Sequence, residues 1–121
     1  LEAATFLFVP PAPSSVSSNP SDSTVVLTWQ NPGNGGSPIT DYVIEYKSAN
    51  SSWNTYDDGV SSNTVSIISG LENNITYQFR ISAVNSVGTS DSSTLISSTP
   101  IPQHPPIICA PLLIQLFALL R

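Results

Sequence analysis

The clearest pattern in the chain is an alternation of apolar and polar residues over positions 77–84. Positions 77, 79, 81 and 83 hold Tyr, Phe, Ile and Ala, and Gln, Arg and Ser lie between them. Successive side chains of a β-strand point to opposite faces, so this period of two predicts a strand with one face on a core and the other in water.

Six further segments carry strand signals. Residues 24–30 are typical, because Val25, Leu27 and Trp29 alternate with smaller or polar residues. Turn-forming Pro, Gly, Asn, Asp and Ser separate these segments. The remaining expected strands span 14–19, 42–48, 53–56, 63–69 and 92–98. Seven short strands and no helical periodicity predict an all-β sandwich.

One stretch predicts how the two sheets connect. Leu71 stands six residues before Tyr77, across the turn Glu72-Asn73-Asn74. A leucine that closes one strand and a tyrosine that opens the next suit a corner between two packed sheets. There the ring fills the core, and its hydroxyl bonds to backbone a few residues upstream.

This corner, followed by Phe-Arg-Ile-Ser-Ala-Val-Asn at 79–85 and by Gly88, resembles the end of a fibronectin type III domain. The Gly- and Pro-rich run 31–38 is similar to the B–C loop of that family, and the resemblance covers residues 10–100. It implies a seven-stranded, immunoglobulin-like β-sandwich with apolar terminal extensions. The expected core residues are Trp29, Tyr42, Ile44, Leu71, Tyr77, Phe79 and Ile81.

The strand over 63–69 has two candidate registers. Simple alternation places Val65 and Ile67 in the core, whereas counting back from Leu71, as the family does, places Ile68 there. A β-bulge would reconcile the two. We favour Ile68 inside.

The chain divides into four parts: an N-terminal extension (1–9), the sandwich (10–100), a Pro-rich linker (101–106) and an apolar tail (107–121). For the extension we expect an untied fragment remnant, with an added strand on another subunit's sheet edge as the alternative. The tail contains a proline and is shorter than the roughly 18–20 residues of a spanning helix. A truncated membrane anchor, a docking helix over 112–120 and non-native read-through remain open for it.

Composition excludes several classes of protein. Hydrophobic residues make up 40% of the chain and charged residues 9%, which fits a globular β-rich module better than a disordered one. Net charge is -5, and the cations are Lys47, Arg80 and Arg121. So few cations exclude nucleic acid as a partner and disfavour docking on an anionic membrane surface. Cys109 is the single cysteine, so no intrachain disulfide can form.

No arrangement of residues suggests catalysis. The single His104 and Cys109 lie in the linker and the tail, and no Gly-x-Ser-x-Gly motif is present. The loop 31–38 lacks the Gly-Lys-Ser/Thr of a phosphate-binding loop. Asp57 and Asp58 lack calcium-loop spacing and predict a solvated turn. We therefore expect no enzyme and no catalytic, metal-ligating or cofactor-binding residues.

Candidate binding features are few. Asn50 and Asn74 begin N-x-S/T sequons, which are glycosylation acceptors if the chain is exported and chance matches otherwise. The F–G loop, 85–91, lacks the Arg-Gly-Asp of some family members. Either it is a plain hairpin turn, or it contacts a partner through Val87, Gly88, Thr89 and Asp91. On the outward sheet face, Glu45 and Arg80 are predicted to pair across two strands.

The resemblance implies a non-catalytic extracellular or cell-surface module, a spacer or adhesion unit of a larger protein. Its partners would be proteins or neighbouring domains, with carbohydrate a further candidate and a membrane only through an anchor in the tail. Two alternatives stay open. One is an accessory domain of a secreted polysaccharide-degrading enzyme, and the other is a subunit that self-associates through its apolar ends.

Overall fold

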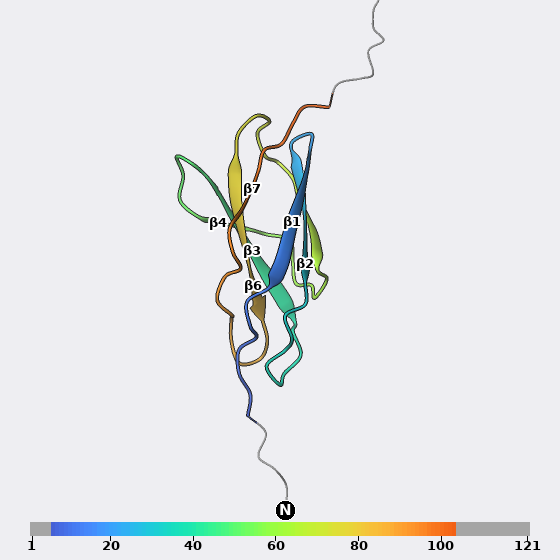
Figure 1. Ribbon diagram of the computed structural model, residues 1–121, viewed down its shortest axis with the longest axis vertical. Coiled ribbons are helices and arrows are strands. Elements are labelled where there is room, and N and C mark those ends of the chain that lie inside the picture. The colour runs from blue at the N-terminus through green and yellow to red at the C-terminus, as the bar shows by residue number, and fades with distance from the viewer. Residues whose placement is uncertain (1–5, 104–121) are drawn as a thin grey trace, which may run out of the picture.

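Two antiparallel sheets face each other in the structure, a computed structural model that describes residues 6–103 (Figure 1). The three-stranded sheet has the order β1-β2-β5, and the four-stranded sheet has the order β4-β3-β6-β7. The strands are β1 (Ser14–Ser21), β2 (Thr24–Gln30), β3 (Asp41–Ser48), β4 (Asn54–Tyr56), β5 (Val65–Ile68), β6 (Tyr77–Val84) and β7 (Ile96–Ser98). This is the predicted seven-stranded sandwich, and no helix occurs over residues 6–103.

The core lies between the sheets and comes from the inward positions of β2, β3, β5 and β6. Trp29 packs edge-on against Tyr42 across the two sheets, with ring centroids 5.2 Å apart. The buried hydrophobic residues are Val25, Leu27, Trp29, Tyr42, Ile44, Ile68, Leu71, Phe79, Ile81 and Ala83. Tyr77 is partly buried and packs against this cluster.

The corner before β6 has the geometry that the sequence predicts. Leu71 is buried, and its N–H donates to the carbonyl of Ser23 over 3.0 Å. The N–H of Glu72 donates to the Tyr77 hydroxyl over 3.0 Å. The hydroxyl therefore fixes the path of the chain between the two sheets.

The register of β5 resolves the choice left by the sequence. Ile68 is fully buried, whereas Val65 and Ile67 are 51% and 60% exposed. The pairing with β2 runs without a shift from Val25–Ile68 to Thr28–Val65, so no bulge is needed. The prediction that Ile68 points inward is confirmed. The register that places Val65 and Ile67 in the core is wrong, because Ser66 and Ile68 share the inward face.

The first strand is longer than predicted. It runs to Ser21 and includes Pro20, which the sequence places in a turn. The Trp29 N–H donates to the Thr64 carbonyl, next to β5. Successive residues of a strand direct their backbone groups to opposite neighbours, so the odd-numbered residues of β2 bond to β5 and the even-numbered ones bond to β1. Pro20 is opposite Val25, so its nitrogen faces the open edge, where a missing N–H costs no ladder bond.

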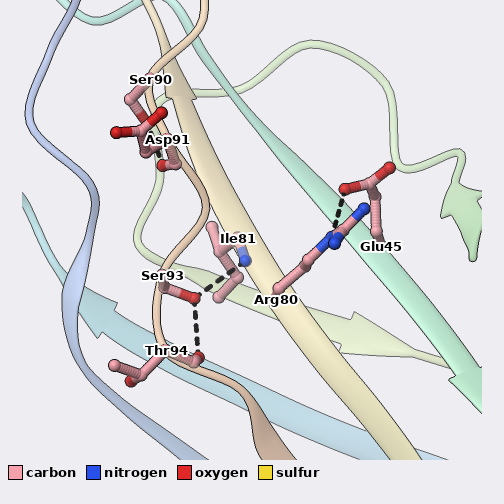
Figure 2. Close-up of polar contacts among 7 residues, drawn as sticks. All are labelled: Glu45, Arg80, Ile81, Ser90, Asp91, Ser93 and Thr94. Carbon is pink, nitrogen blue, oxygen red and sulfur yellow. Dashed lines mark hydrogen bonds and ion pairs between the residues drawn. The ribbon is translucent and has the colours of Figure 1, made fainter.

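The last strand is shorter than predicted, because β7 begins at Ile96 and not at 92. Two buried serines replace the ladder before it (Figure 2). Ser93 Oγ accepts the Ile81 N–H over 3.0 Å and donates to the Thr94 carbonyl over 3.1 Å. Ser90 Oγ likewise accepts the N–H of Ala83 over 2.9 Å. The two hydroxyls accept these β6 N–H groups, while the N–H groups of Ser90 and Ser93 donate to the carbonyls of Ala83 and Ile81. The chain therefore stays attached without strand geometry.

Within the described range no helix is long and apolar enough to cross a membrane. The predictions for His104, Cys109 and the tail 107–121 lie outside the described residues.

Candidate binding surfaces

One end of the sandwich is organised around the buried side chain of Asn85, at the start of the F–G loop. Its Nδ2 donates to the carbonyls of Phe8 and Asn34, both over 2.8 Å, and more weakly to that of Ser37 over 3.4 Å. Its Oδ1 accepts the N–H groups of Val87 over 2.9 Å and Gly88 over 3.2 Å. A single amide thus joins the N-terminal segment, the B–C loop and the F–G loop.

Residues 6–9 lie along these two loops at the lower end of Figure 1 and form no strand. The Phe8 N–H donates to the Gly35 carbonyl over 2.8 Å. Gly35 has φ +67°, and a Cβ there would clash with the Phe8 carbonyl oxygen, so only glycine permits this approach. The expectation of an untied extension is therefore wrong for this segment, because the loops supply its hydrogen bonds.

This end, which we call the loop end, exposes apolar side chains. Phe6, Phe8 and Val87 are 72%, 62% and 46% exposed. Gly88 is only partly exposed, because Val9 Cγ1 would lie 3.2 Å from a Cβ at that position. Of the predicted partner contacts, Val87, Thr89 and Asp91 are open to solvent on this loop.

On the outward face of the four-stranded sheet, the two cationic side chains of the described residues, Lys47 and Arg80, lie over the indole ring of Trp53. Arg80 Cζ lies 4.0 Å from the centroid of the Trp53 ring, and Lys47 Nζ lies 5.3 Å from it. Arg80 Nε also donates to Glu45 Oε1 over 2.7 Å, which confirms the predicted cross-strand pair (Figure 2). This cluster ties Trp53, just before the short edge strand β4, to the centre of the sheet.

Carboxylates gather on the connection between β4 and β5. Burial raises the pKa of Asp58 above its ordinary value, opposed by hydrogen bonds from its own backbone and from Ser66, and the nearby carboxylates of Asp41 and Asp57 raise it further. Over residues 6–103 no three His, Cys, Asp or Glu side chains are placed to hold a metal ion. The arrangement concentrates negative charge and provides no coordination shell.

The sandwich, its tyrosine corner and its loops match a known domain. The family model for the fibronectin type III domain matches residues 10–99. The chain belongs to this family. The human protein sidekick-1 is 41% identical over 93 residues, which cover 75% of this chain and 4% of that protein. The Xenopus laevis cell adhesion molecule-related/down-regulated by oncogenes protein is 38% identical over 89 residues, 72% of this chain and 7% of its own length. The chain therefore spans only a small part of these relatives.

A solved structure agrees with these relatives. A crystal structure of titin domains superposes with a TM-score of 0.69 at 31% identity, covering 77% of this chain and 32% of that one. A fibronectin type III domain is thus present here as one unit of the kind found in long multidomain chains.

The two sequon asparagines of this fibronectin type III domain lie near the end opposite the loop end. Asn50 and Asn74 are both exposed and line one shallow groove, together with Tyr77 and with Ser48 and Ala49 at the end of β3. Asn74 adopts φ +69°, and its N–H donates to the Pro100 carbonyl over 2.8 Å. Each side chain is accessible for modification.

Sequence reasoning missed Asn85, Ser90 and Ser93 as organising residues. Each is a common loop residue, and nothing in its neighbourhood marks burial. For Asn85 two signals were available. It ends the run 79–85 that resembles the family, and it directly follows the last residue of β6, where an Asx side chain caps a turn.

Proposed function

We propose that this fibronectin type III domain is a non-catalytic interaction module of a cell-surface or secreted protein, and that its loop end contacts a protein partner or a neighbouring domain. Relatives that carry the domain include proteins named as cell adhesion molecules, which supports an adhesion role. The domain spans residues 10–100 in this proposal, and residues 6–9 belong to the contact surface.

The observation that carries the proposal is the bracing of the loop end. Asn85 fixes three segments at once, so Phe8 and Val87 are held exposed on a rigid frame. Exposed apolar side chains on a preordered surface bind with little loss of conformational entropy.

The test is an adhesion assay in which the chain is displayed both on non-adherent cells and on beads, and the attachment of the beads to the cells is measured. Val87→Asp should reduce bead attachment at least severalfold, because a charge is placed in the apolar contact. Val60→Asp is the matched control, since Val60 is 81% exposed on the β4–β5 connection and takes no part in the hydrogen bonds of Asn85. Equal attachment of the parent and Val87→Asp chains would exclude the loop end as the contact.

Export is tested separately through the sequons. When the chain is secreted from mammalian cells, we expect a mass decrease on enzymatic deglycosylation. Asn50→Gln and Asn74→Gln should each remove one glycan. A secreted chain without any glycan would contradict the proposal that these two sites are used.

A further inference from the structure

The strand β5 is the open edge of the three-stranded sheet. It follows β2 in the order β1-β2-β5, and over residues 6–103 no strand pairs with its other side. Because Thr64 bonds to Trp29, the even-numbered residues of β5 direct their backbone groups to β2. The N–H and C=O groups of Val65 and Ile67 therefore point to the open edge.

The other three edges are protected against strand addition. β1 has a register shift between Ser14 and Ser17 and presents Pro20 at its outer side. β4 and β7 are each three residues long, one residue shorter than β5. Short strands, prolines and irregular registers all discourage edge pairing. β5 has a regular ladder and contains neither proline nor charge, and its two outward side chains are β-branched.

A groove of about 560 Å³ runs beside this edge, lined by Asp58, Ser61, Asn63 and residues 64–67. The connection from β4 leaves the edge free because it is attached elsewhere. The Ser61 N–H donates to Asp41 Oδ1 on β3 over 3.1 Å. An extended segment thus has both a row of backbone partners and space beside them.

The charge of the groove selects its occupant. Asp58 is the charged residue that lines it, and its Oδ2 accepts a hydrogen bond from Ser66 Oγ over 3.3 Å. Lys47 and Arg80 lie on Trp53, on the outer face of the other sheet. The described residues of a second copy would bring another Asp58 to the groove while their cations, Lys47 and Arg80, lie on the other sheet, whereas a basic segment would compensate the charge.

We propose that the edge of β5 binds an extended segment of a partner protein as an added antiparallel strand, with a Lys or Arg of that segment opposite Ser66 and beside Asp58. A segment residue opposite Ser66 lies on the same face of the sheet as Ser66 and therefore reaches the Asp58 carboxylate. The β-branched residues on either side of it in the segment lie beside Val65 and Ile67. The inference rests on the proposed function as an interaction module and concerns a surface separate from the loop end.

The test is a nuclear magnetic resonance titration of the ¹⁵N-labelled 121-residue chain. The probe is the acetylated and amidated peptide Ser-Thr-Val-Lys-Val-Thr-Ser, with a Glu-for-Lys peptide as its matched control. We expect saturable shifts at the amides of residues 64–68, and at least about threefold weaker binding of the Glu peptide, the size of one exposed ion pair. N-methylation of both valines should abolish binding.

Variants separate charge from backbone pairing. Asp58→Asn should weaken binding of the Lys peptide about threefold and remove the preference over Glu. Glu72→Gln, an exposed carboxylate at the distant corner, should change neither. Absence of shifts at 64–68 up to about 2 mM peptide overturns the proposal, as does equal affinity for both peptides. Concentration-dependent shifts at β5 without peptide would indicate a second copy and overturn it as well. Peptide binding that persists in Val87→Asp distinguishes this surface from the loop end.

Discussion

Replacement of Asn85 by alanine tests whether one amide holds the loop end together. The substitution removes donors to Phe8 and Asn34 and acceptors for Val87 and Gly88, at distances of 2.8, 2.8, 2.9 and 3.2 Å. A typical hydrogen bond contributes a net of about 0.5–1.5 kcal/mol, and some of the released carbonyls regain water. We therefore expect a loss of about 2–4 kcal/mol in the free energy of unfolding.

The assay is urea denaturation followed by tryptophan fluorescence, since Trp29 lies in the core. The midpoint should fall by more than about 1 M with an unchanged m value. Amide hydrogen exchange should also accelerate at Phe8, whose N–H bonds to Gly35, because its segment loses its attachment.

The matched control is Asn54→Ala. Asn54 is exposed, and its Nδ2 donates only to the nearby Ser52 carbonyl over 3.1 Å. Its effect should stay within about 0.5 kcal/mol. If the two variants lose the same stability and exchange at Phe8 is unaltered, the loop end does not depend on Asn85 and the reasoning about its rigidity fails.

Three further predictions concern the sandwich itself. Ile68→Ala should cost about 2–5 kcal/mol in urea denaturation and Ile67→Ala about 0.5 kcal/mol or less, and the reverse order would refute the register. Tyr77→Phe should cost about 1 kcal/mol through loss of the bond from Glu72, measured in the same way, and a neutral result would remove the corner hydroxyl from the account. Asp58 has a raised pKa in the folded chain, so its ionisation disfavours folding. Asp58→Asn should therefore stabilise the chain at pH 7. The stability difference between the two chains should disappear as the pH falls below the ordinary Asp pKa of about 3.9, and thermal unfolding of both chains at pH 7 and below that pKa checks this.

Predictions succeeded where the signal was local and periodic. The strand β6, the inward positions of β2 and the pairing of Glu45 with Arg80 all follow from alternation and from adjacency of two strands. The bounds of β1 and β7 were wrong, because the sequence does not show which side of a strand faces a neighbour. Pro20 is tolerated at an outer edge, and the hydroxyls of Ser90 and Ser93 replace a ladder that the sequence alone suggested.

The candidate surfaces were less predictable than the fold. The exposed residues Val87, Thr89 and Asp91 lie on the loop that the sequence indicated, but their rigid frame depends on Asn85 and on Phe8, 77 positions apart in the chain. The unprotected edge of β5 emerged only from the strand order, since an edge is defined by the absence of a neighbour.

The sequence by itself determined the class of fold, because alternating side chains and turn residues act over a few positions. Tertiary structure alone decided which loops share a buried amide, which serines satisfy backbone groups and which edge stays open. Those properties depend on contacts between segments distant in the chain, and the energy of such a contact exists only once both segments are in place.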